Sequence, residues 1–212
     1  MDQLEDNGGA PDDSSVREQL AHVLLGGFVH DIGSPLAALT SNLSVAKELA
    51  ETDDEPSRNE LKEVLEDLEM ATKRLTELAS DLRGYVGLPV GTGSFEDLAR
   101  ASLRLARSHL SRRANVELKI DPALRPTAPS AVVLRAVGEL VVAVTRELGP
   151  GARQHQLSLR TVADGFTLEV APPPPGNVAR AVRVATARLG SEATVTSTPE
   201  RLEVRVPLAW AT

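Results

Sequence analysis

The chain lacks cysteine altogether and contains few aromatic residues and few histidines. Of its 212 residues none is cysteine, 2% are aromatic and four are histidine. The absence of cysteine excludes disulfide bonds, thiol catalysis and cysteine-based zinc sites, and the four histidines are too scattered for a metal site. We therefore expect no bound metal ion, and a chain without thiols fits a reducing cytoplasm.

Long apolar runs and concentrated basic segments are also missing. The longest purely aliphatic run covers residues 140–144, far short of the ~20 residues that span a bilayer. Because the first residues are acidic rather than basic, we expect neither a signal peptide nor a membrane span. The net charge is −7, and the sixteen bases of residues 86–212 are dispersed among eleven acids and many aliphatic residues. No base-reading motif appears, so we expect no nucleic-acid binding.

The composition, with 42% hydrophobic and 25% charged residues, is that of ordinary folded domains. Residues 1–14, rich in Asp, Gly and Ser, predict a disordered arm. Apolar residues at helical spacing predict a helix over 16–51, the acids and proline of 52–57 predict a turn, and a second helix ends near 85. In this second helix leucine recurs every seven residues, at Leu61, Leu68, Leu75 and Leu82.

Residues 15–85 therefore predict an antiparallel helical hairpin with apolar stripes that two helices cannot enclose. Dimerisation into a four-helix bundle is the simplest way to bury them. The alternative is that residues 86–212 fold back over the same face.

Residues 84–94, with four glycines and a proline, predict a linker. Beyond it, residues 95–212 alternate between helical and strand patterns. Helices are expected over 95–110, 130–148 and 178–189, and strands over 116–120, 156–162, 165–170, 193–197 and 201–207. The expected fold class is α+β, with the hairpin followed by an α/β sandwich that has its helices on one face of the sheet.

His30 has an unusual position in the first helix. Counting 100° per residue, it lies about 180° from the centre of the stripe that includes Leu24 and Phe28, so the imidazole should face solvent. Asp31 is its neighbour, and Pro35 removes the amide that would bond the carbonyl of Asp31, which should kink the helix. A solvated His-Asp pair can occur on any helix, but these features together favour chemistry with a macromolecular partner.

The segment around His30, FVHDIGSPL at residues 28–36, resembles the phosphoacceptor motif of sensor histidine kinases. RLTELASDL at 74–82 is similar to the second helix of their dimerisation and phosphotransfer domain, and residues 95–208 follow, more weakly, the order of elements in their ATP-binding domain. The resemblance implies that His30 accepts a phosphoryl group and that Asp31 fixes its tautomer. In related kinases a Thr or Asn at the position of Ser34 orients a water that dephosphorylates the receiver, and a serine can make the same contact. Small residues that would let a partner helix approach lie near His30, at Gly27, Gly33, Ser34, Ala37 and Ser41.

The ATP chemistry that the resemblance implies is interrupted. The two asparagines that would hold phosphates and magnesium correspond to Glu139 and Ala143, and alanine has no oxygen for a hard cation. The adenine-reading glycine-rich loop is replaced by residues 171–176, with four consecutive prolines that supply neither an acid nor amide donors. We therefore expect residues 95–212 to form a degenerate ATPase-like domain that binds no nucleotide cofactor.

This combination resembles bacterial histidine phosphotransferases that dimerise like kinases. The expected function is a cytoplasmic phosphorelay protein that shuttles phosphate between response-regulator receiver aspartates through His30, with magnesium supplied by the receiver and possible input from a hybrid histidine kinase. Two alternatives stay open. The chain could be a degenerate kinase that regulates a kinase or receiver by occupancy, or an ATP-using kinase with an eccentric pocket.

Overall fold

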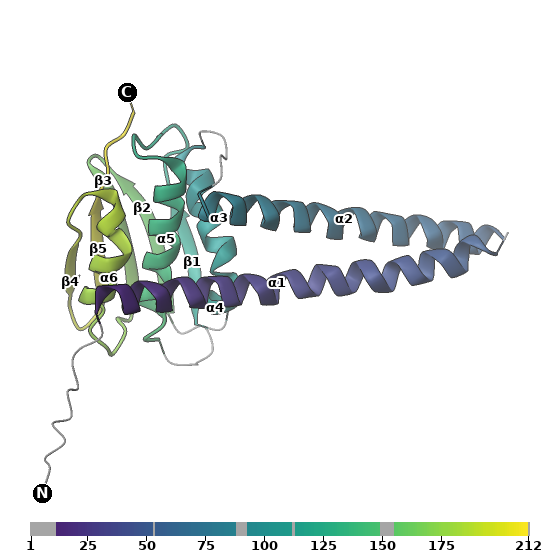
Figure 1. Ribbon diagram of the computed structural model, residues 1–212, viewed down its shortest axis with the longest axis horizontal. Helices are drawn as coiled ribbons and strands as arrows, with labels where there is room; N and C mark the ends of the chain where they lie inside the picture. Colours follow the sequence, from purple (N-terminus) through teal and green to yellow (C-terminus); the bar gives the residue numbers. More distant parts are fainter. Residues whose placement is uncertain (1–11, 53, 88–92, 112, 149–154, 212) are drawn as a thin grey trace, which may run out of the picture.

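A computed structural model describes residues 12–211 except 53, 88–92, 112 and 149–154. Two long helices, α1 (Asp13–Ala50) and α2 (Glu55–Tyr85), form an antiparallel hairpin that projects from an α/β part (Figure 1). The predicted hairpin is present, with both helices within a few residues of their expected bounds.

α1 begins earlier than the sequence pattern predicted. Asp12 is its N-cap, and one carboxylate oxygen accepts a hydrogen bond from the backbone N–H of Ser15 at 2.7 Å. Asp13 lies in the first turn, where a carboxylate is favoured by the helix dipole, and pairs with Arg180 at 3.1 Å. Residues 12–14 of the expected arm are therefore ordered helix start, and residues 1–11 lie outside the described residues. The helix continues without interruption through Pro35.

The α/β part contains a five-stranded mixed sheet. Its helices are α3 (Phe95–Leu105), α4 (Arg107–Leu110), α5 (Ser130–Thr145) and α6 (Ala179–Thr186), the last continued by the short 3₁₀ helix η1 (Ala187–Leu189). Its strands are β1 (Ala114–Lys119), β2 (His155–Val162), β3 (Gly165–Ala171), β4 (Thr194–Ser197) and β5 (Leu202–Pro207). The order across the sheet is β1-β2-β3-β5-β4, with β1 parallel to β2 and the other pairs antiparallel. The expected α+β class is confirmed.

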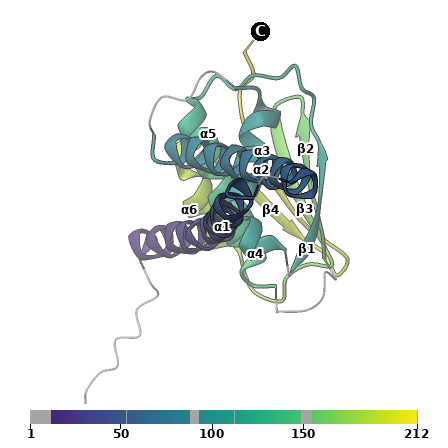
Figure 2. The ribbon, with the colours of Figure 1, turned by 90° about the vertical axis from the view of Figure 1, so that its right-hand side faces the viewer.

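The helices lie together on one face of this sheet, as Figure 2 shows. The inward-facing positions of β2, β3 and β5 are fully buried, including Leu159, Leu168 and Val204, and α5 packs above them as a nearly all-apolar helix. The outward positions carry charged pairs such as Arg160 with Glu169 and Glu203. This alternation gives the sheet one face in the core and one in solvent.

The expected helix over 95–110 is divided at Ala106 into α3 and α4, which brings the short α4 against α1. The capping box of Ser94 and Asp97 fixes the start of α3, where Ser94 Oγ accepts from the backbone N–H of Asp97 at 3.1 Å. Arg104 on α3 forms two hydrogen bonds to Asp81 on α2, at 2.6 and 2.8 Å. α3 and α4 are thereby held against the base of the hairpin.

The base of the hairpin and the α/β part share one apolar core. Leu20, Leu24 and Phe28 of α1 are buried against α5, α6 and α4, and Tyr85 is the buried last residue of α2, at the predicted end of the second helix. The fold-back alternative is therefore realised for the base of the hairpin. The distal half lies apart from the sheet (Figure 1), and its apolar side chains Leu36, Leu43 and Leu65 are about half exposed, at 48%, 50% and 50%.

By length and composition α1 is also apolar enough to cross a membrane. It contains an 18-residue window of mean hydropathy 1.3, of which 17% is buried. The length of the longest aliphatic run did not reveal this window, because the apolar residues of α1 are separated by glycine, serine and histidine and form no continuous run. Core helices of soluble proteins and signal sequences meet the same criterion.

Candidate functional site

His30 lies on α1 with its imidazole exposed, as its helical position predicted. The side chain is 80% exposed, whereas the side chain of the adjacent Asp31 is only 12% exposed. His30 Nδ1 and Asp31 Oδ1 are 3.4 Å apart. With the proton on Nδ1, the imidazole donates a long hydrogen bond to the carboxylate, and the unprotonated Nε2 is left as the nucleophile.

An open hollow of about 630 Å³ adjoins His30 where α1, α2 and α4 meet. Beside His30 and Asp31 it is lined by Ser34 of α1, Arg74 of α2 and Arg107 of α4. Arg113, just after α4, also lines the hollow, and its guanidinium donates a hydrogen bond to the backbone oxygen of His109 at 2.8 Å. His30 therefore adjoins a hollow that three arginines from three segments of the chain also line.

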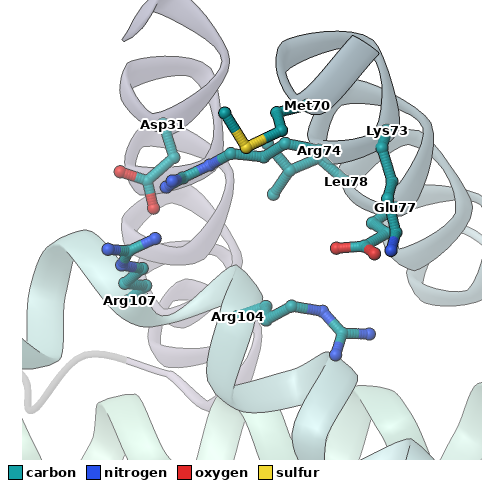
Figure 3. A pocket seen from close by; sticks show the side chains of 8 residues that line it. All are labelled: Asp31, Met70, Lys73, Arg74, Glu77, Leu78, Arg104 and Arg107. Carbon is teal, nitrogen blue, oxygen red and sulfur yellow. The ribbon is translucent and has the colours of Figure 1, made fainter. Parts of the chain in front are cut away.

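A second, smaller hollow of about 250 Å³ shares Asp31, Arg74 and Arg107 with the first. Figure 3 shows the guanidinium groups of Arg74 and Arg107 directed from α2 and α4 towards the carboxylate of Asp31. Neither arginine forms an ion pair within 4.0 Å with any described carboxylate. Oδ2 of Asp31 is buried and has no hydrogen-bond partner among the described atoms.

The small residues near His30 divide into two groups. A Cβ built on Gly27 would collide with Oγ of Ser108 and lie 3.8 Å from the backbone oxygen of Leu105, so this glycine allows α4 of the same chain to approach α1. Gly33 has no heavy atom near its missing Cβ. It remains exposed together with Ser34, Ala37 and Ser41. These four residues, with His30, leave one side of α1 open to a partner.

Glu139 and Ala143 lie in α5 and are buried, where the sequence comparison placed nucleotide ligands. Tyr85 donates its hydroxyl proton to Glu139 Oε1 at 3.3 Å, and Arg188 lies 3.8 Å from the same oxygen. Burial raises the pKa of Glu139 above its ordinary value, and the charge of Arg188 opposes this shift. Oε2 has no hydrogen-bond partner in the described structure. The carboxylate thus belongs to a contact between α2, α5 and η1.

α1 covers the side of α5 next to these positions. The missing Cβ of Gly138 would lie 3.4 Å from a methyl carbon of Leu24, so the two helices are in close contact there. Val142 and Ala143 are fully buried, and in the proline segment Pro174 is also buried. Among the described residues no group of three or more His, Cys, Asp or Glu side chains can hold a metal ion.

The arginines beside His30 are the site residues that sequence reasoning did not identify. Arg74 is part of the motif in the second helix, and Arg107 and Arg113 belong to the basic stretch RSHLSRR at 107–113. This local concentration of charge was the available signal. Of the other histidines, His22 is exposed, and burial together with the charge of Arg113 lowers the pKa of His109 to about 4.

No protein-family model and no curated protein sequence matches the chain. Three solved structures to which it is similar are histidine kinases. The Acinetobacter baumannii histidine kinase AdeS is 13% identical with a TM-score of 0.41, over 84% of this chain and 98% of that one. The cytoplasmic segment of histidine kinase QseC is 14% identical with a TM-score of 0.42, over 65% and 95% of the two chains. The mycobacterial sensor histidine kinase MprB is 16% identical with a TM-score of 0.38, over 55% and 97%. At these identities the likeness concerns the fold alone.

Proposed function

We propose that this protein is a histidine phosphotransferase of a two-component phosphorelay, which carries a phosphoryl group between receiver aspartates on His30 without binding ATP. The observation that carries the proposal is the placement of His30. Its ring is exposed while Nδ1 faces a carboxylate at 3.4 Å, so Nε2 is oriented outward from a fixed helix position. The neighbouring side of α1, with Gly33, Ala37 and Ser41, is small and open to a receiver.

In the accepting step, Nε2 of His30 attacks the phosphorus of a receiver's aspartyl phosphate. The N–P bond forms as the P–O bond to the aspartate breaks, and the aspartate leaves as a carboxylate. The ring keeps its proton on Nδ1 and becomes positively charged, which the carboxylate of Asp31 stabilises. In the donating step a second receiver's aspartate attacks the same phosphorus, and His30 returns to its neutral form.

This reaction does not require a nucleotide site in the same chain. A receiver brings its own aspartate and magnesium ion, so the phosphotransferase supplies only a positioned nucleophile and charge stabilisation. Three observations on α5 support a function without ATP. Ala143 is buried, the carboxylate of Glu139 accepts a hydrogen bond from Tyr85, and Leu24 of α1 packs against Gly138.

The same proposal includes a homodimer in the cytoplasm, with receiver domains as partners. The half-exposed leucines of the distal hairpin support dimerisation through residues 30–80, because a second hairpin would remove them from water. The small residues beside His30 remain on a different side of α1 and stay available to the receiver.

The test is phosphotransfer from a phosphorylated receiver to the purified 212-residue protein in the presence of magnesium. We expect a label that survives base and is lost in acid, as a phosphoramidate bond would be. His30→Gln should abolish labelling, and His22→Gln, an exposed histidine of the same helix, should not. Labelling that persists in His30→Gln would contradict the proposal. If no receiver of the source organism labels the protein although receivers still bind to it, the result would instead favour a degenerate kinase that regulates its partner by binding alone.

A further inference from the structure

The side chains that line the hollow beside His30 carry a net positive charge. Arg74, Arg107 and Arg113 contribute three positive charges, and Asp31 is the carboxylate that lines the same hollow. With a neutral imidazole the balance is 3 − 1 = +2 for these side chains. A phosphoryl group on a side chain carries roughly −1.5 to −2 at neutral pH, which matches this excess.

Two of these arginines have free hydrogen-bonding capacity. Arg74 and Arg107 make no side-chain hydrogen bond or ion pair with a described residue, and both point into the space beside Asp31 (Figure 3). Arg113 is anchored through Nη1 to the backbone oxygen of His109, while its buried Nε has no partner among the described atoms. A planar guanidinium can donate two parallel N–H bonds to phosphoryl oxygens, and its charge persists throughout the physiological pH range.

We propose that Arg74, Arg107 and Arg113 form an anion site that holds the phosphoryl group while it moves to and from Nε2 of His30. This inference rests on the proposed phosphotransfer through His30. In the transition state the charge spreads over the three equatorial oxygens of the phosphoryl group, and fixed cations beside it stabilise that charge. The bonds that form and break are those of the proposed transfer, and the arginines exchange no proton or electron.

The proposal gives the α/β part a role in the chemistry. α4 supplies Arg107, and the close approach of Gly27 to Ser108 sets α4 against α1. The ion pair between Arg104 and Asp81 holds α3, which leads directly into α4, against α2. The α/β part thereby positions Arg107 and Arg113 next to His30, which lies on α1.

The experiment compares Arg74→Gln, Arg107→Gln and the double variant with Arg83→Gln. Arg83 is an exposed arginine in the last turn of α2 and does not line the hollow, so this control removes the same charge from the same hairpin. The transfer rate from a phosphorylated receiver is measured at saturating receiver, and binding of the unphosphorylated receiver is measured separately. We expect each single variant to slow transfer about tenfold and the double variant about a hundredfold, with receiver affinity changed less than about threefold.

A second arm uses phosphoramidate, a small phosphodonor that requires no receiver. Labelling of His30 by phosphoramidate should fall in the same variants and stay unchanged in Arg83→Gln. Rates in all variants within about threefold of the control would overturn the anion site and leave the proposed function intact. A parallel loss of rate and receiver affinity, with normal phosphoramidate labelling, would show that the arginines bind receiver carboxylates and would also overturn it. Arginine-dependent phosphoramidate labelling without transfer from any receiver would retain the anion site and contradict the phosphorelay.

Discussion

Replacing Asp31 by asparagine tests the charge next to the proposed acceptor, His30, because the change keeps the size of the side chain and removes its charge. His30 Nδ1 and Asp31 Oδ1 are 3.4 Å apart, and two unit charges at this distance attract each other by about 1 kcal/mol at the permittivity of water and about 5 kcal/mol at an effective permittivity of ~20. Since the imidazole is 80% exposed, the lower value applies to the free protein. In the proposed transfer a docked receiver covers the imidazole of His30, which moves the attraction energy towards the higher value.

We therefore expect Asp31→Asn to slow phosphotransfer by about ten- to a thousandfold, taking ~1.4 kcal/mol for each factor of ten. The assay is rapid-quench transfer from a phosphorylated receiver over a range of receiver concentrations. The loss should appear in the maximal rate rather than in the concentration for half-maximal rate, because the charge on the ring develops during the reaction. Asp67→Asn, an exposed acid of α2, is the control. A maximal rate within about threefold of this control would refute the electrostatic role of Asp31.

Three further predictions concern dimerisation, ATP binding and the pH dependence of folding stability. The 212-residue protein should sediment as a dimer, and Leu75→Asp should make it monomeric because a charge buried in the bundle costs several kcal/mol. A monomeric parent protein would contradict the four-helix bundle. Calorimetry with Mg-ATP should show no binding, and a dissociation constant below ~1 mM, or ~4 kcal/mol of binding free energy, would favour the kinase alternative. Because burial raises the pKa of Glu139, the folded protein holds this proton more tightly than the unfolded chain, so stability falls as pH rises from 4.5 through the raised pKa. Glu139→Gln should weaken this fall and increase the free energy of unfolding at pH 7 in urea titrations, and a variant less stable than the parent at pH 7 would contradict the argument.

Local signals in the sequence predicted most helix and strand positions. Asp54 caps α2 by accepting from the backbone N–H of Ser57 at 2.8 Å, and such caps can be read from the sequence alone. The break at Ala106 could not be predicted, because neither glycine nor proline marks it. It depends on tertiary packing, since Ala106 and Leu110 are both buried.

In the candidate site, too, the sequence predicted local features but not the contacts between distant segments. The exposure of His30 follows from helical periodicity, which needs only the spacing of residues along α1. The convergence of Arg74, Arg107 and Arg113 on it requires α4 to pack against α1 and α3 to pack against α2, and these segments are tens of residues apart. Spacing along one helix cannot show which distant side chains share its surroundings.

The apolar stripe of α1 shows why the sequence left open whether a second hairpin or residues 86–212 cover it. Counting 100° per residue, Leu20 and Leu36 lie ~160° apart, at opposite edges of this broad stripe, and periodicity contains no information on what covers either edge. In the structure the α/β part buries Leu20 and Leu24, and Leu36 stays 48% exposed. One stripe thus has two different environments along its length, and His30 lies between them. The base fixes α1 against the sheet domain, which positions α4 beside His30, while the distal half retains the apolar surface that a second hairpin would bury. The proposed dimer and the proposed anion site therefore use separate parts of the same helix, so we expect a substitution that disrupts one to leave the other intact.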